Sequence, residues 1–355
     1  MLNSQKLKDF ALKELKVDKI AIGSIERLKN APPDMNPLNM MPRAKSVIAF
    51  AQRILRGCYR GIDEGTHWPS YQVFGYSGLN HVNSKTLYRL GRFVESFGYE
   101  AMPAPSSASL REFGPRGPSP KPGKPPREIT LNLRIAAAST GLGEIGWSKV
   151  FLTEEFGPRQ RIGIILTEAE LEPDPIPEKK LCDGCKQCVR ECPGCALPKD
   201  KSVEIELNGK KVSWCDIDIG KCKLTHFGLN RKSSPHFVKR FPGVYLPVEQ
   251  QELTWLEAWD LGWAIFPFVP TYASLSSHPV PICGARGCIV ACMKHLEKKG
   301  VVKNQFVNKR GFSDNKPWSL PEKPPHTGHH GFVYEPKYQS SEDGKDSFAP
   351  PSDWY

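Results

Sequence analysis

The most informative stretch of this chain reads Cys182-Asp-Gly-Cys185-Lys-Gln-Cys188-Val-Arg-Glu-Cys192-Pro193. Its spacing is C-x₂-C-x₂-C-x₃-C-P. Three thiolates at this interval can wrap one face of an iron–sulfur cubane, and in proteins with two cubanes the fourth cysteine binds the other one. Zinc is the alternative, but zinc sites rarely use four cysteines so closely spaced and followed by proline. The stretch therefore predicts two [4Fe–4S] clusters.

Two such clusters need further ligands, and the chain has them. It holds eleven cysteines, ten of them between Cys182 and Cys292. The additional thiols are Cys222 and those of the run Cys283-Gly-Ala-Arg-Gly-Cys288-Ile-Val-Ala-Cys292. Crosswise pairing predicts Cys182, Cys185, Cys188 and Cys292 for the first cluster, and Cys192, Cys222, Cys283 and Cys288 for the second.

Three cysteines are left over by this pairing: Cys58, Cys195 and Cys215. We interpret them as small buried or surface thiols. Cys215 competes with Cys222 for a place in the second cluster, and we favour Cys222. The second group is irregular, because C-x₄-C replaces the usual C-x₂-C and Met293 stands where proline is common.

Composition limits the size and the partners of the protein. The chain has 355 residues, of which 39% are hydrophobic, and its formal net charge is +11. This length allows two domains. A basic balance suits nucleic acid, an acidic partner protein or an anionic cofactor. Because we find no arginine-rich arm and no aromatic RNA-binding signature, we expect no specific nucleic-acid partner.

The chain ends and apolar stretches bear on its compartment. The first ten residues contain no apolar core of a signal peptide and no twin-arginine pair. The most apolar stretch, residues 253–275, contains Glu257, Asp260, Pro267 and Pro270, so we expect a buried segment or loop rather than a membrane span. We expect a cytoplasmic protein, in which cysteines serve metals more often than disulfides.

Hydrophobic periodicity gives a coarse arrangement of secondary structure. It predicts helices over residues 4–15, 84–97 and 131–138, and strands over 20–25, 47–51 and 162–167. This alternation indicates an α/β (α+β) fold. Residues 103–126 are rich in proline and predict a long functional or disordered loop. We divide the chain into domains of residues 1–170 and 171–300, followed by an extended tail of residues 301–355.

A glycine-rich turn precedes the cysteines. Gly141, Gly143 and Gly146 follow the helical pattern of residues 131–138. Glycines at such a point let backbone approach a bulky ligand closely, and a plain structural turn is the equal alternative. The turn is not a dinucleotide-binding fingerprint, because a helix and not a strand comes before it.

From Ala138 to Pro193 the chain resembles the cobalamin-dependent reductive dehalogenases and epoxyqueuosine reductase. In that superfamily a G-L-G-x-x-G segment is followed by a strand entry like Glu155-Phe-Gly-Pro-Arg159, an acidic linker with prolines, and the C-x₂-C-x₂-C-x₃-C-P motif. The segment Trp214-Cys-Asp-Ile-Asp-Ile-Gly-Lys-Cys222 is similar to the part that carries the first ligand of the second cluster.

This resemblance implies a nitroreductase-like, corrinoid-binding domain followed by a ferredoxin-like module with two [4Fe–4S] clusters. The cofactors would be cobalamin and the two clusters. The activity would be reductive cleavage of a carbon–heteroatom bond in a small molecule, with electrons from a low-potential donor such as ferredoxin or flavodoxin. The residues implied to lie against the corrin are Gly141, Leu142, Gly143, Gly146, Trp147 and Ser148.

The sequence also departs from the family. Epoxyqueuosine reductase has a general-acid aspartate in an Asp-Ser-Ala-Pro-like stretch, and residues 104–109 contain none, which argues against epoxyqueuosine as the substrate. By resemblance to the dehalogenases, Tyr76 is the candidate proton donor, with Lys149 or Arg134 as the assisting charge. Two alternatives stay open. One is an electron-transfer protein that reduces a separate corrinoid protein, and the other is a ferredoxin-like scaffold.

Overall fold

The computed structural model describes residues 1–32, 35–64, 67, 69–104, 121–123, 129, 131–178, 180–230, 232–233, 253–265 and 281–306. All of them belong to one compact unit, Met1–Lys316. Most of the proline-rich stretch 103–126 and nearly all of the tail after residue 301 lie outside the described residues, so their predicted roles stay predictions. The domain boundary near residue 170 also stays a prediction.

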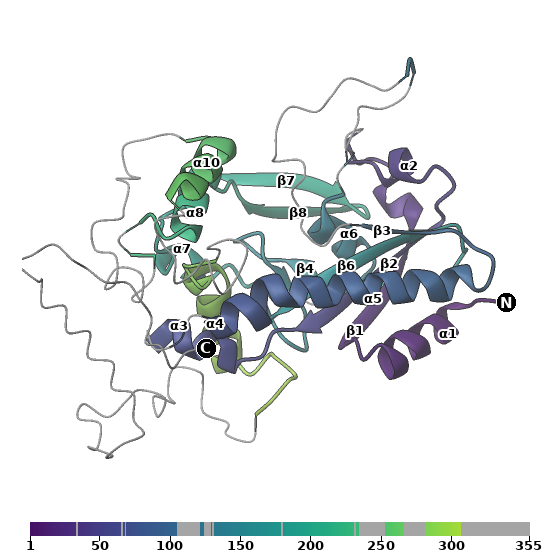
Figure 1. Ribbon diagram of the computed structural model, residues 1–355, viewed down its shortest axis with the longest axis horizontal. Coiled ribbons are helices and arrows are strands. Elements are labelled where there is room, and N and C mark those ends of the chain that lie inside the picture. The colour runs from purple at the N-terminus through teal and green to yellow at the C-terminus, as the bar shows by residue number, and fades with distance from the viewer. Residues whose placement is uncertain are drawn as a thin grey trace, which may run out of the picture. The chain divides into compact units, whose positions relative to one another are not determined.

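A four-stranded sheet forms the centre of the N-terminal half (Figure 1). Its order is β1-β2-β6-β3, and every neighbouring pair is antiparallel. The strands are β1 (Lys19–Ser24), β2 (Ser46–Arg53), β6 (Gln160–Thr167) and β3 (Ala101–Ala104). The inner strand β2 is buried on both faces, which explains why its sequence is a continuous apolar run.

Alternate residues of β2 point to two different cores, as the period of a strand requires. Ile48 and Phe50 face one core, and Val47 and Ala49 face the other. The first core is closed by α1 (Ser4–Asp9), η1 (Phe10–Glu14) and the long helix α5 (Ser77–Glu95), which crosses the sheet in Figure 1. The second is closed by α6 (Leu133–Ser139) and the hairpin β7 (Ser202–Leu207) and β8 (Lys210–Cys215).

Short helices carry the cysteine-rich part of the chain. They are α7 (Gln187–Arg190), α8 (Ile219–His226), α10 (Trp255–Ile265), the π-helix η7 (Arg286–Ala291) and α12 (Cys292–Lys298). Helix α8 packs on α10, where Gly262 leaves room for the ring of Phe227. Within the apolar stretch 253–275, residues 255–265 thus form a helix with one buried side, made of Trp255, Ala258 and Gly262. Among the described residues, none of the helices has the length and apolar character needed to cross a membrane.

The remaining elements are short connections: η2 (Ile25–Leu28), α2 (Pro37–Met40), α3 (Gly57–Glu64), α4 (Pro69–Tyr71), η3 (Gln72–Tyr76), β4 (Glu144–Ile145) and β5 (Phe151–Leu152). The mixed helix and strand content confirms the coarse fold class. The six elements predicted from periodicity are present, with α5 starting seven residues earlier than the predicted residue 84. The nitroreductase-like and ferredoxin-like descriptions stay predictions.

Candidate iron–sulfur centres and the adjoining tyrosine

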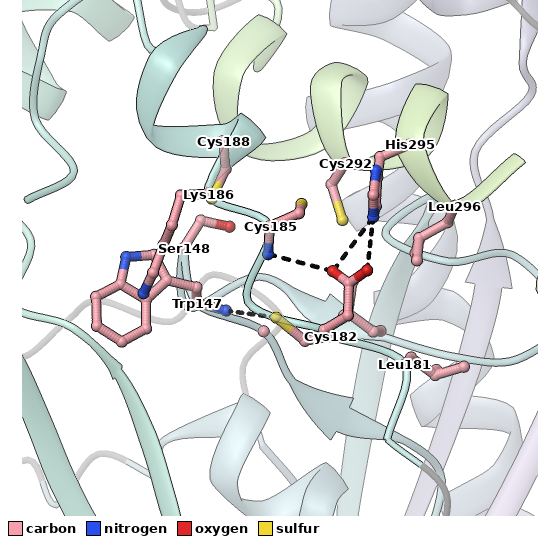
Figure 2. Close-up of a pocket in the computed structure, with 13 residues that line it drawn as sticks. Trp147, Ser148, Leu181, Cys182, Cys185, Lys186, Cys188, Cys292, His295 and Leu296 are labelled. Atoms are coloured by element: carbon pink, nitrogen blue, oxygen red, sulfur yellow. Dashed lines mark hydrogen bonds and ion pairs between the residues drawn. The ribbon is translucent and has the colours of Figure 1, made fainter. Parts of the chain in front are cut away.

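The first cysteine set surrounds one pocket (Figure 2). Cys182, Cys185 and Cys188 come from the loop before α7 and from α7 itself, and Cys292 is the first residue of α12. These are the four thiols that the sequence assigns to one cluster. The structure brings them together, and their role as ligands stays a prediction.

The loop of the first set is bent by two residues in the left-handed region. Gly184 has φ 72° and Lys186 has φ 56°. A left-handed conformation costs a lysine free energy that its surroundings must supply. Asp183 helps, because its carboxylate accepts a hydrogen bond of 3.2 Å from the backbone N–H of Cys185. The strained turn places Cys182, Cys185 and Cys188 around the same pocket.

Glu144 fixes the start of this loop. Its carboxylate oxygen Oε1 accepts hydrogen bonds from the backbone N–H groups of Leu181, at 3.0 Å, and of Cys182, at 2.7 Å. Burial raises the pKa of Glu144, and these two donors act in the opposite direction. On the other side, the N–H of Trp147 points at the Sγ of Cys182 at 3.4 Å.

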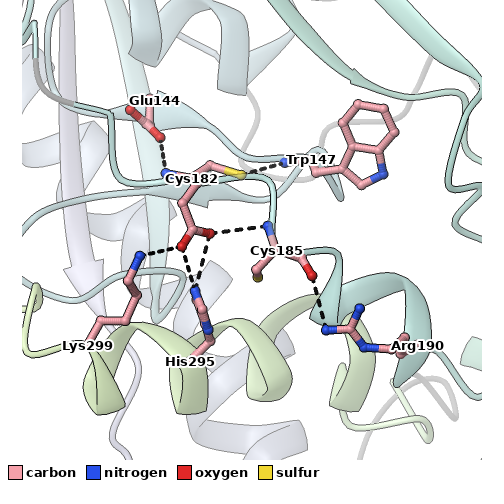
Figure 3. A network of polar contacts seen from close by, with 8 residues as sticks. Glu144, Trp147, Cys182, Cys185, Arg190, His295 and Lys299 are labelled. Atoms are coloured by element: carbon pink, nitrogen blue, oxygen red, sulfur yellow. Dashed lines mark hydrogen bonds and ion pairs between the residues drawn. The ribbon is translucent and has the colours of Figure 1, made fainter.

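Asp183 ties the loop to α12 (Figure 3). Hydrogen bonds from Lys299 and His295 hold the pKa of its carboxyl well below the ordinary range. The carboxylate, the thiol of Cys185 and the His295 ring lie close enough to hold a metal ion. The ammonium group of Lys299 already forms an ion pair with the carboxylate of Asp183. We therefore interpret these side chains as an ion-paired link between the loop and α12.

The second cysteine set consists of Cys192, Cys222, Cys283 and Cys288. Burial raises the pKa of the Cys283 thiol to about 12, and the charges of Cys222 and Cys192 add to the rise. Burial also raises the pKa of Cys288 far above its ordinary value, with Cys283, Cys222 and Cys192 contributing. The four thiols thus act on one another, as the predicted crosswise grouping requires, and their role as ligands also stays a prediction.

Of the three cysteines left over, Cys215 is buried in a cluster with Cys188 and Leu197. Burial raises its pKa to about 12, with the charge of Cys188 as the next cause. Cys222 acts on Cys283, which favours Cys222 for the second set. Cys58 is buried in an apolar core, and Cys195 is exposed.

The donor sets fit iron–sulfur clusters. Four neighbouring thiols in a region of low dielectric cannot ionise together unless a positive group lies among them. Cluster sulfurs are also stabilised by N–H donors, and the N–H of Trp147 is such a donor at Cys182. The first set therefore has the thiols and an N–H donor that suit a cubane, and the second set has the thiols.

Tyr76 lies beside the second set. Its hydroxyl is 3.2 Å from Nε2 of His226, and the guanidinium carbon of Arg161 is 4.2 Å from the centroid of its ring. Burial raises the pKa of Tyr76, the positive charge of Arg161 lowers it, and Arg134 lowers it less. Of the two predicted assisting charges, the structure thus brings Arg134 near Tyr76. Lys149 instead places Nζ 4.9 Å from the centroid of the Trp214 ring.

The glycine turn contacts the chain itself. A Cβ on Gly141 would lie 2.3 Å from the carbonyl oxygen of Pro175, and one on Gly143 would lie 2.1 Å from that of Leu152. Leu142 is fully buried. These contacts explain the glycines without a ligand, so the geometry gives no support to a corrin at this turn.

The other two residues predicted at the corrin also have partners in the chain. The indole Nε1 of Trp147 donates to the carbonyl of Pro198 at 3.1 Å, and the Ser148 hydroxyl donates to that of Cys288 at 3.5 Å. Trp147 and Ser148 both line the first pocket. Their contact with a corrinoid stays a prediction, as does that of the four turn residues.

Sequence reasoning missed four side chains of this region: Glu144, Asp183, Arg161 and His226. One signal was present for His226, which follows Cys222 by four residues and so shares its face if the segment is helical. Glu144 stands inside the glycine turn, where a carboxylate among glycines marks backbone N–H groups to be bound. Arg161 had no local signal, because only the fold brings β6 to Tyr76.

Comparison with known proteins finds relatives in both families that the sequence resembles. No family model matches the chain. A tetrachloroethene reductive dehalogenase of Dehalobacter restrictus is 28% identical over 167 residues, which cover 46% of this chain and 25% of that protein. An epoxyqueuosine reductase of Listeria monocytogenes is 37% identical over 57 residues, which cover 16% of this chain and 15% of that protein.

Among solved structures, an epoxyqueuosine reductase with an epoxyqueuosine-modified tRNA stem loop has a TM-score of 0.43 and 16% identity, covering 84% of this chain and 82% of that one. The expectation of no nucleic-acid partner for this chain stays a prediction. The chain spans only about a quarter of the length of the curated dehalogenase it matches. The sequence matches confirm the resemblance to reductive dehalogenases and epoxyqueuosine reductase.

Proposed function

We propose that this chain is a corrinoid- and iron–sulfur-dependent oxidoreductase that reductively cleaves a carbon–heteroatom bond in a small molecule. One observation carries the proposal: two sets of four cysteines lie close together, and the second lies beside a partly buried tyrosine with Arg161 over its ring. The relatives named reductive dehalogenase and epoxyqueuosine reductase support it. The low-potential donor, such as ferredoxin or flavodoxin, is part of the proposal.

The two cysteine sets have different tasks in this proposal. Each would hold a [4Fe–4S] cluster, which supplies one-electron transfer when bound. The first set would be the entry for electrons from a donor. The second set lies beside Tyr76, through His226, so it would pass electrons on toward the reacting substrate.

Tyr76 would act as the general acid. Its phenol keeps its proton at neutral pH, as an ordinary tyrosine does, and burial raises the pKa of the group. A phenol that gives its proton to a substrate atom leaves a phenolate, and the positive charge of Arg161 over the ring favours that product. Proton transfer by a positioned side chain typically contributes about 10²–10⁴-fold to a rate.

Binding of a corrinoid is the least supported part of the proposed function. Cobalamin, when bound, would supply a strong nucleophile or one-electron donor. Gly141, Leu142 and Gly143 pack against the chain itself, and Gly146, Trp147 and Ser148 line the pocket of the first cysteine set, so we assign no residue to corrinoid binding. This observation favours a second candidate function, an iron–sulfur electron-transfer protein or reductive activator that serves a separate corrinoid protein.

Metal analysis separates the two. The full chain is purified without oxygen, incubated with cobalamin, desalted and examined by metal analysis and visible spectroscopy. We expect about eight irons per chain and stoichiometric cobalt for the first function. About eight irons per chain without cobalt would support the second candidate, an iron–sulfur electron-transfer protein or reductive activator. Zinc, or about four irons, would contradict both.

A further inference from the structure

His226 lies between a thiol of the second set and Tyr76. Its Nδ1 is 3.8 Å from the Sγ of Cys283, within hydrogen-bond range for sulfur, and its Nε2 is 3.2 Å from the hydroxyl of Tyr76. The rings of Tyr76 and His226 meet edge to face, with centroids 5.3 Å apart. One imidazole thus spans the gap between a predicted ligand and the candidate acid.

The fold holds His226 at this place from two directions. It is the last residue of α8, four positions after Cys222, so both side chains lie on one face of the helix. Its backbone carbonyl accepts a hydrogen bond of 2.9 Å from the N–H of Ile282, the residue before Cys283. The helix and the loop that carry two thiols of the second set are therefore joined at His226.

The acceptor character of sulfur decides which ring nitrogen carries hydrogen. A cysteine that binds iron has lost its proton, so its sulfur can only accept hydrogen bonds. Nδ1 of His226 must then donate to Cys283. In the neutral ring Nε2 is left as an acceptor, and it receives the hydroxyl hydrogen of Tyr76.

We propose that His226 is a positioning residue that donates a hydrogen bond to Cys283 at the second iron–sulfur centre and orients the hydroxyl of Tyr76. This inference rests on the proposed function, because it needs a cluster at the second set. A donor to a ligand sulfur stabilises the reduced, more negative cluster and so raises its reduction potential. Removing it favours the oxidised cluster.

The test is a redox titration followed by electron paramagnetic resonance on the anaerobic, iron-loaded full chain. A hydrogen bond of this kind is worth up to about 1.4 kcal/mol, which is a factor of ten in an equilibrium constant. We expect His226→Phe to lower the potential of one centre, with up to a tenfold change in its reduction equilibrium, which is about 59 mV for one electron. His226→Gln, which keeps a donor, should recover part of the potential.

Matched controls separate this role from a general loss of structure. His81 is exposed on α5, and His81→Phe should leave both potentials unchanged. Tyr76→Phe keeps the donor to Cys283, so it should shift the potential less than His226→Phe does. His226→Ala serves if the phenylalanine variant does not hold both centres.

The outcomes are distinct. If wild-type protein holds two centres and neither His226→Phe nor His226→Ala lowers the potential of either, the inference is wrong and the proposed function stands. If wild-type protein holds only one centre, the proposed function is wrong, and the inference about His226 is wrong as well because it depends on that function.

Discussion

The two cysteine sets each bring four thiols together, but they take these thiols from differently arranged segments of the chain. The first draws three thiols from one short loop. The second draws its thiols from three separate stretches, and the thiols of both sets are buried to a similar degree. A loop that is local in sequence sets its own geometry, whereas thiols from distant segments depend on the packing of the whole fold. The second set should therefore be the more sensitive of the two to changes elsewhere in the chain.

Both sets nevertheless share one feature of their backbone conformation. Lys186 stands between Cys185 and Cys188 with φ 56°, and Ala285 stands between Cys283 and Cys288 with φ 52°. Both are non-glycine residues in the left-handed region, which is uncommon. Each begins a short helical turn that carries a thiol. Strain of this kind is typical of functional loops.

The largest effect we expect is loss of one whole centre. Cys222→Ser should lower the iron content from about eight to about four per chain, because the second set loses a ligand. Cys215→Ser should leave about eight, since Cys215 lies against Cys188 and not against Cys283. Iron analysis of the two anaerobic proteins decides, and the reverse result would give the ligand position to Cys215.

A middle-sized effect is expected where η7 packs against the end of the cysteine loop, at Cys192. Gly287 lies in η7, and a Cβ there would be 2.5 Å from the backbone Cα of Cys192. Because backbone cannot move aside as a side chain can, Gly287→Ala should cost about 2–3 kcal/mol of stability. We expect the temperature of half-unfolding in an anaerobic thermal scan to fall by several degrees.

The control for this change is Gly91→Ala in α5, where the nearest atom to a new Cβ is 3.7 Å away. It should be neutral or slightly stabilising, because alanine favours helix over glycine. The paramagnetic signals of both centres should broaden in Gly287→Ala alone. A change in only one signal would show that the sets are less closely joined than the contact at Cys192 implies.

The smallest effect should fall on the first set alone. Glu144→Ala removes the acceptor of the N–H groups of Leu181 and Cys182. Water can replace part of this contact, so the cost is about 1 kcal/mol. Iron release to a chelator should be about fivefold faster from the first centre and unchanged from the second. Equal acceleration at both would show that Glu144 supports the fold in general.

The cysteine loop was predictable because its spacing alone sets its geometry. Three thiols three residues apart on a tight turn can reach one point whatever the rest of the chain does. The second set was harder, because Cys222 and Cys283 are brought together by the packing of α8 against the segment before η7. For the same reason Arg161 had no signal, since its place beside Tyr76 depends on where β6 runs.

Some elements of the fold were likewise predictable from the sequence, and others were not. The apolar runs of β2 and β6 were visible because both strands are buried on the sheet. Strand β3 was missed because it contains Pro103, and proline is tolerated there because β3 lies at the sheet edge. The hairpin β7–β8 was missed although its turn is Asn208-Gly209, both with positive φ, which is a strong hairpin signal.

The π-helix η7 has a consequence for electron flow. The N–H of Val290 bonds to the carbonyl of Ala285, five residues back, and the same rod continues into α12. Cys288 and Cys292 stand four residues apart on it yet face different sets, a rise of only about 6 Å along the axis. If each set holds a cluster, as we propose, one continuous helical segment would carry a ligand of each. Small relative movements of the surrounding elements would then leave the distance between the two clusters, and the rate of electron transfer between them, nearly constant.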